Sequence, residues 1–167
     1  MHYRIEHEFE IDAKSYWDMF FDPAYTKELY GEMKMKSFEV LEQKESGGVL
    51  TRVLRATPST NIPEIFKRVV SDASYVERDR FDRGKGSMEV VVEPQMLKNK
   101  MDMRSLYSVV PTGEGRCKRI FEGDVKVSIM IIGGQIEKFM VDELRKNYEI
   151  ATTVTRRVIA KRKAAQA

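Results

Sequence analysis

Few residues of this 167-residue chain have a type and spacing that could do chemistry, and the first of them is His7. Residues 2–12 alternate between polar and apolar side chains, which predicts a half-buried strand with His7 beside Ile5 and Phe9 on its apolar face. An imidazole that faces a pocket could hydrogen-bond a ligand oxygen or act as a base. The alternative is a core histidine with protein partners, which is the commoner state of a buried polar group.

Two carboxylates, Glu77 and Asp79, form the second candidate. They share a strand phase with Tyr75 and Phe81, and if that phase faces inward, both acids enter a cavity and could pair for acid–base work. The opposite register would bury Val76 and leave both acids in solvent. Because charged side chains occupy that other phase as well, the sequence leaves both registers open.

Other chemical sites find little support. Two histidines and one cysteine without tight ligand spacing predict no metal site, and we expect no cofactor. The Gly-containing segment 83–86 is typical of a hairpin turn, not of a phosphate-binding loop. Cys117 lies between Arg116 and Lys118, which could lower the pKa of its thiol, but no base can be assigned to it. We interpret Cys117 as structural and assign no catalytic residue.

Composition indicates an ordinary globular protein, with 42% hydrophobic and 33% charged residues and a formal net charge of +3. That charge is too small to argue for nucleic-acid binding. A single cysteine allows no intramolecular disulfide, which favours a reducing compartment. The N-terminal residues lack the apolar core of a signal peptide, and residues 127–132 fall far short of the roughly 20 residues of a membrane helix. We expect one soluble, cytoplasmic domain over residues 1–167.

These candidates must be positioned by a mostly antiparallel sheet. Asp12 is predicted to cap a short helix that runs through Phe21, and Pro23 to begin a second one that ends near Gly31. Residues 64–70 fit either a short helix or an extended edge. Turn signals then separate six further predicted strands, which cover residues 36–45, 49–57, 74–82, 87–93, 101–110 and 116–130.

The last segment changes period. After Gly133-Gly134, apolar residues recur at spacings of three and four from Ile136 to Val158, which predicts an amphipathic helix of about eight turns that ends near residues 161–163. Such a helix must bury its apolar stripe, and only the concave face of the sheet is large enough. The predicted fold is α+β: a curved antiparallel sheet of about seven strands wrapped around a long C-terminal helix, with two short helices after the first strand.

This order of elements resembles the START-like, or SRPBCC, helix-grip superfamily, which includes the Bet v allergens and the polyketide cyclases. The most specific stretch is residues 124–138, where an apolar strand, a Gly133-Gly134 turn and Ile136-Glu137 resemble the strand-to-helix junction of a bacterial branch of unknown function. Residues 52–63 are similar as well, whereas Met130 stands where members of this branch commonly carry proline. The resemblance implies the helix-grip fold and an apolar ligand, but no reaction.

In helix-grip proteins, the sheet-facing side of the long helix forms one wall of a cavity. Methionines suit adaptable apolar walls, although they serve equally well as core filler, and a tyrosine hydroxyl can orient a ligand. The loop at Ile62-Pro63 would lie near the cavity mouth. We therefore expect ligand contacts from His7, Phe9, Ile62, Met88, Val90, Met103, Tyr107, Phe121, Phe139, Met140, Leu144 and Tyr148.

Three functions remain open. The leading hypothesis is the binding of a lipid or other small apolar molecule, which could extend to its transport. A cyclase- or dehydratase-like enzyme for an apolar or aromatic substrate would require His7, Glu77, Asp79 and Tyr107 to converge, and an interaction module would have a filled core. The basic C-terminus, residues 156–163, could contact an anionic membrane or simply complement the helix dipole. It lacks the interleaved aromatic residues that nucleic-acid binding would use.

Overall fold

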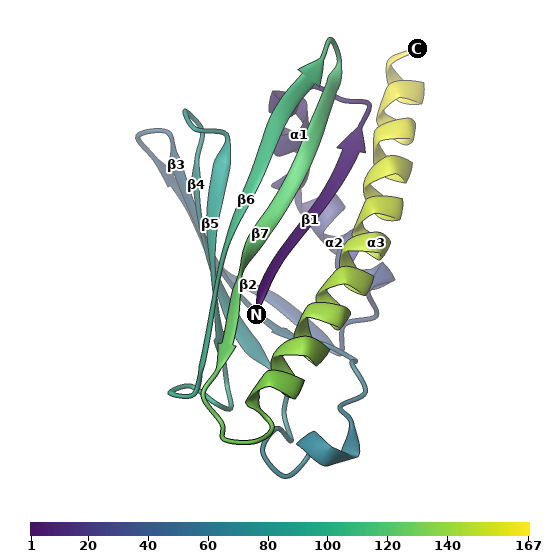
Figure 1. Ribbon diagram of the computed structural model, residues 1–167. Helices are drawn as coiled ribbons and strands as arrows, with labels where there is room; N and C mark the ends of the chain where they lie inside the picture. The colour runs from purple at the N-terminus through teal and green to yellow at the C-terminus, as the bar shows by residue number, and fades with distance from the viewer.

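A seven-stranded antiparallel sheet forms the frame of the protein, whose computed structural model describes residues 1–167 (Figure 1). The strand order is β1-β7-β6-β5-β4-β3-β2, so only the pairing of β1 with β7 joins strands distant in sequence. The strands are β1 (His2–Phe9), β2 (Ser37–Ser46), β3 (Val49–Thr57), β4 (Tyr75–Asp82), β5 (Ser87–Pro94), β6 (Met101–Gly113) and β7 (Arg116–Val127).

Three α-helices and one short 3₁₀ helix complete the fold, namely α1 (Ala13–Phe20), α2 (Pro23–Glu32), η1 (Glu64–Phe66) and α3 (Gly133–Gln166). Asp12 caps α1, because its side chain accepts a hydrogen bond from the backbone N–H of Ser15 at 2.9 Å. Asp22 caps α2 in the same way, with Pro23 in the first turn. The predicted helix-grip architecture is therefore confirmed.

Several predicted boundaries were wrong by a few residues. The first strand ends at Phe9, since the chain turns toward the cap at Asp12. The last strand ends at Val127 and not at residue 130, because Ile131 adopts a positive φ of 72° in a turn where the N–H of Gly133 bonds to the carbonyl of Ile129. The final helix has 34 residues and extends beyond the predicted end.

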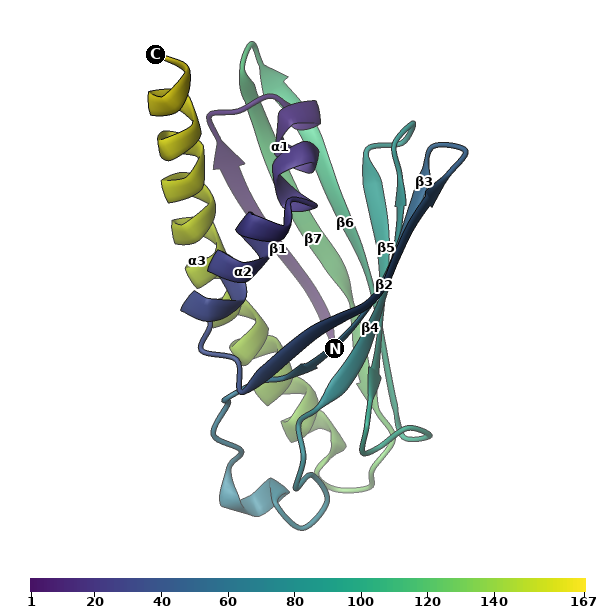
Figure 2. The same cartoon turned by 180° about the vertical axis from the view of Figure 1, so that it is seen from behind.

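The helices lie on the concave face of the sheet. Helix α3 runs along β1 and β7, and Figure 2 shows α1 and α2 between α3 and the strands at the other end of the sheet. An aromatic cluster fills the space around α1, with the Trp17 and Phe81 ring centroids 4.2 Å apart and Tyr16 and Phe20 packed beside Trp17. This cluster joins α1 to the concave face of the sheet.

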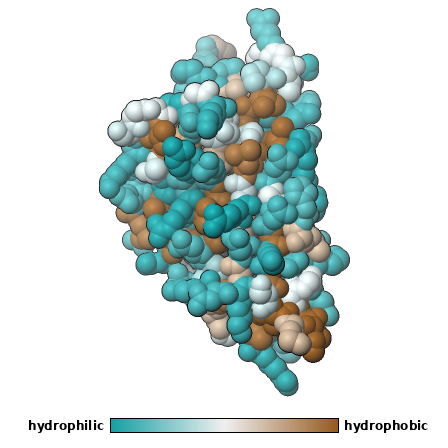
Figure 3. Space-filling view, turned by 60° about the vertical axis from the view of Figure 1, so that its left-hand side comes forward, coloured by the Kyte–Doolittle hydropathy of each residue, from teal (hydrophilic) through white to brown (hydrophobic).

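The two sheet edges differ in character. Strand β1 lies beside α3, whereas β2 is exposed over most of its length and shifts register between Val40 and Glu42. Figure 3 shows a face on which hydrophilic residues predominate, with hydrophobic patches between them. No helix combines the length and the apolar character that crossing a membrane requires.

Gly123 offers a test of the packing between β6 and β7. A Cβ atom at this position would lie 2.2 Å from the carbonyl oxygen of Arg104 and 2.8 Å from the Cα of Ser105, both backbone atoms that cannot move independently. Gly123→Ala should lower the free energy of unfolding by about 1–3 kcal/mol or more, as measured by urea denaturation. Gly134→Ala is the control, because its Cβ would meet no atom within 4 Å and alanine favours the helix. Equal stability of the two variants would contradict this packing.

Candidate functional site

A cavity of about 290 Å³ lies between the concave face of the sheet and α3. Its wall contains 35 residues, 26 of them hydrophobic, so the space is mainly apolar. They come from all three α-helices, strands β3 to β7, η1 and the loops that connect α2 to β2, β3 to β4 and β5 to β6. This volume is close to the lower limit of about 300 Å³ for small-molecule pockets, and it is far larger than a packing defect.

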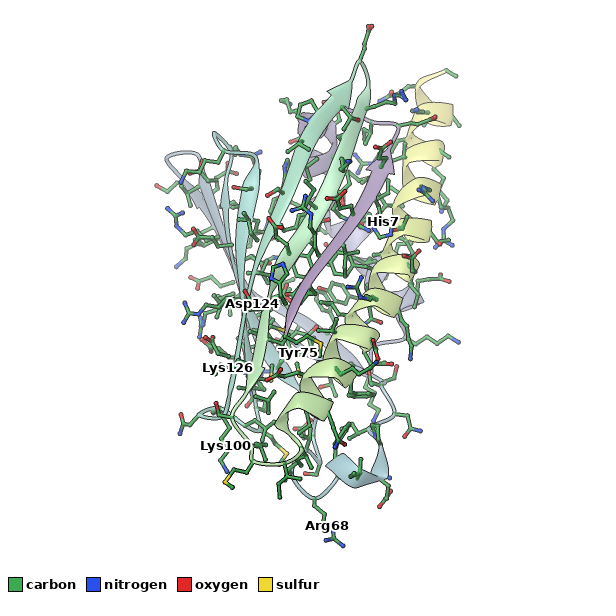
Figure 4. All side chains as sticks on the ribbon, in the orientation of Figure 1. His7, Arg68, Tyr75, Lys100, Asp124 and Lys126 are labelled. Atoms are coloured by element: carbon green, nitrogen blue, oxygen red, sulfur yellow. The ribbon has the colours of Figure 1, made fainter.

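The structure brings most of the expected ligand-contacting residues together on this wall. Strands contribute Met88, Val90, Met103, Tyr107 and Phe121, α3 contributes Phe139, Met140, Leu144 and Tyr148, and the loop contributes Ile62. His7 and Phe9 do not line the cavity, contrary to expectation. Their strand, β1, is the edge of the sheet beside α3, and Figure 4 places His7 there. By contrast, the cavity residue Tyr75 lies on the inner strand β4.

His7 has a protein partner on each ring nitrogen. Arg119 Nη2 lies 2.8 Å from His7 Nδ1, and His7 Nε2 lies 3.0 Å from Glu149 Oε1. A guanidinium can only donate, so Nδ1 accepts and Nε2 carries the proton that is donated to Glu149. Burial lowers the pKa of His7, which keeps this imidazole neutral. The geometry fits the alternative of a histidine satisfied by its protein partners.

Arg119 is a cavity residue that the sequence interpretation missed. It is only 1% exposed, sits opposite His7 in the β1–β7 register, and lines the cavity. Its Nη2 also lies 2.6 Å from Thr152 Oγ1, and its guanidinium stacks over the rings of Phe9 and Tyr148. The available signal was its strand phase, which it shares with apolar residues such as Phe121.

Tyrosine hydroxyls surround the same region. The hydroxyls of Tyr16 and Tyr107 are 2.5 Å apart, and that of Tyr25 is 2.8 Å from Thr155 Oγ1. Burial raises the pKa of Tyr107 to about 12, so its hydroxyl stays protonated at neutral pH. Thr155 Oγ1 donates its proton to the carbonyl oxygen of Ala151 at 2.6 Å, so Tyr25 donates to Thr155. Tyr107 lines the cavity and, where Tyr16 donates to it, its own hydroxyl can donate a hydrogen bond to an oxygen atom inside the cavity.

A second polar group lies across the β3–β4 pair. Arg52 contacts Asp79 Oδ2 through Nε at 2.8 Å and through Nη2 at 2.7 Å, and both side chains are almost fully buried. The inward register of Glu77 and Asp79 is thus the one that the structure adopts. Glu77 is half-buried and lines the cavity, and burial, followed by the nearby Asp79, raises the pKa of Glu77 to about 8. A protonated Glu77 can donate to Asp79, whose Oδ1 otherwise lacks a partner.

The structure also describes the surroundings of Cys117 and of the basic C-terminus. Burial raises the pKa of the Cys117 thiol to about 11, opposite to the lowering that its cationic neighbours could cause, so the thiol stays protonated. Much of the basic C-terminus is ion-paired within the chain: Arg157 and Lys161 contact Glu28, and Arg162 contacts Asp22.

A curved antiparallel sheet that wraps a long C-terminal helix over an apolar cavity defines the START-like helix-grip class. Solved structures of this class superpose along nearly the whole chain. A protein from Thermus thermophilus aligns with a TM-score of 0.68 and 16% identity, covering 96% of this chain and 99% of that one. The Zhui aromatase/cyclase from a Streptomyces species aligns with a TM-score of 0.62 and 12% identity, covering 97% of this chain and 96% of that one. A START superfamily protein from Mycobacterium smegmatis aligns with a TM-score of 0.61 and 15% identity, covering 94% of this chain and 98% of that one.

A family model places the chain more specifically than the fold class does. A family model described as "Protein of unknown function (DUF2505)" matches residues 4–159, and the chain belongs to this family. No curated protein matches the chain. At identities as low as those of the solved structures, the likeness establishes the fold, and the function has to be argued from the cavity itself.

The raised pKa of Glu77 predicts a specific dependence of stability on pH. A carboxyl whose folded-state pKa is about 8, against 4.5 in the unfolded chain, stabilises the fold fully below about pH 4.5, and this contribution is lost as the pH rises to about 8. Glu77→Gln, which is neutral at every pH, should therefore show a smaller decline in the free energy of unfolding between about pH 5 and pH 8. Urea denaturation at several pH values measures this decline.

The control for this experiment is Glu89→Gln, which neutralises an exposed carboxylate on the adjacent strand β5. It should leave the pH profile close to that of the wild type. A Glu77→Gln profile that matches the wild type would show that Glu77 is ionised in the folded protein.

Proposed function

We propose that the protein binds a lipid or another small apolar molecule in the cavity between the sheet and α3, and carries it. The observation behind this proposal is the cavity itself, which has mainly hydrophobic walls and lies where a filled core would otherwise be. An empty apolar cavity forgoes van der Waals contacts, and a ligand of matching shape restores them.

The composition of the wall supports a ligand that is not fixed by many directional contacts. Met88, Met103 and Met140 place flexible thioethers around the space, while aromatic rings such as Phe121 and Tyr148, stacked with centroids 4.7 Å apart, provide flat surfaces. The few polar groups can orient the ligand within this apolar wall. An interaction module with a filled core fits this interior less well.

A second candidate is a cyclase-like enzyme, which the named activity of the Zhui aromatase/cyclase and the protonation of Glu77 favour. Glu77 and Tyr107 both line the cavity and could exchange or donate protons to an aromatic substrate. The complete set of four residues does not converge there, because His7 lies outside the cavity and Asp79 is held by Arg52. Binding therefore remains the leading proposal.

The first test is to identify what the purified protein carries. Native mass spectrometry should detect a bound mass, and denaturing extraction should release an apolar molecule that mass analysis can assign to a class. A bare protein that also fails to bind a fluorescent fatty-acid probe would contradict the proposal. Such a result would leave the cyclase-like alternative only for substrates that are more polar.

A matched pair of substitutions on β6 tests whether binding occurs in the cavity. Met103 lines the cavity, whereas Leu106 is 38% exposed on the opposite face of the same strand. Met103→Trp should fill part of the space and weaken binding of the fluorescent probe by about tenfold or more, or about 1.4 kcal/mol. Leu106→Trp should leave the affinity unchanged. Equal effects of both substitutions, measured by fluorescence titration, would place the probe elsewhere.

A further inference from the structure

Arg119 is a buried cation with no carboxylate partner. The atoms that its Nη2 contacts are the imidazole nitrogen of His7, the carbonyl oxygen of Tyr148 and the hydroxyl of Thr152, all of which belong to neutral groups. Its Nε is buried without any partner. Glu149 is connected to Arg119 only through the neutral imidazole of His7 and is itself largely exposed. The positive charge is therefore left uncompensated inside the protein.

The other charged groups of the cavity wall are already matched. Arg52 is paired with Asp79, and Glu77 is kept protonated by its surroundings. Of the remaining acids, Asp72 accepts from the backbone N–H of Ser74 and Glu143 pairs with Lys146. Arg119 thus remains as an unpaired charge at the cavity.

An unpaired charge in a protein interior destabilises the fold, and arginine cannot avoid this by losing its proton. Stacking over Phe9 and Tyr148 offsets part of this destabilisation, since aromatic faces attract cations. A negatively charged ligand group would offset much more, because charge-assisted hydrogen bonds to guanidinium are among the strongest in proteins. Tyr107, which lines the cavity nearby, supplies a protonated hydroxyl as a further donor.

We propose that the ligand of this cavity is an apolar molecule with one acidic oxygen group, of the carboxylate type, which pairs with Arg119. This inference rests on the proposed binding function and specifies the chemical class of the ligand. The acidic group would lie in the protein interior, since Arg119 is only 1% exposed. The apolar body would extend toward Ile62, Met101 and Ile136 at the loop end of the cavity.

The test compares acids with neutral molecules of the same shape. Two matched pairs serve as probes: decanoate with decanol, and 2-naphthoate with 2-naphthalenemethanol. Isothermal titration of the wild type should show that at least one acid binds about tenfold or more tightly than its neutral partner. Arg119→Met, which keeps the length of the side chain without its charge, should remove this preference while the neutral member still binds. Arg119→Lys should restore part of it, and Arg116→Met, at the exposed start of the same strand, should leave it intact.

Each outcome decides between the proposals. Equal affinity for acid and neutral partner in the wild type overturns the acidic ligand and leaves the apolar-ligand function standing. Binding of neither member of either pair overturns both proposals. An acid preference that persists in Arg119→Met overturns the assignment to Arg119.

One measurement on the wild type does not depend on whether the variants fold. Bound decanoate with a carbon-13 carboxyl label should remain ionised at a pH below its titration in free solution. Protonation at the same pH as the free acid would contradict pairing with a guanidinium.

Discussion

A single helix cannot fill the concave face of a seven-stranded sheet, and the rest of the structure follows from this constraint. Helix α3 covers β1 and β7, which leaves the strands toward β3 uncovered on their inner face. The aromatic side chains of α1 fill part of the remaining space, with Trp17 packed against Phe81 and Tyr107. The cavity lies in the space that these side chains leave between the sheet and α3. The cavity is thus a result of the number and placement of the covering elements.

The two inward-facing arginines represent different solutions to the same electrostatic difficulty. Arg52 finds its counter-charge in the facing strand, since the β3–β4 register sets Asp79 directly opposite. Arg119 faces His7 across β1 and β7, and a neutral imidazole can hold its position without cancelling its charge. His7 is therefore best understood as a positioning residue, one that links the guanidinium to Glu149 at the surface.

Local patterns predicted the elements well, because alternation and helical spacing report burial directly. The cap at Asp12 and the apolar stripe of α3 are properties of neighbouring residues, and most of the cavity-lining side chains followed from them. The contacts of Arg119 with His7 did not follow from local patterns. These contacts depend on the pairing of β1 with β7, which joins residues more than 100 positions apart, and on the position of β1 at the edge of the sheet. The sequence does show that Arg52 and Arg119 share a strand phase with apolar residues. It does not show which residue lies opposite each of them on the neighbouring strand.

The exposed strand β2 bears on how the protein behaves at high concentration. An open edge is a template on which another chain can add a strand. Here Glu39, Glu42, Lys44 and Glu45 place charges along the edge, and the register shift after Val40 interrupts the regular ladder of backbone groups. A second copy that approached in β-pairing geometry would meet a bent and charged border. The sheet can therefore remain open at this end without becoming the seed of a fibril.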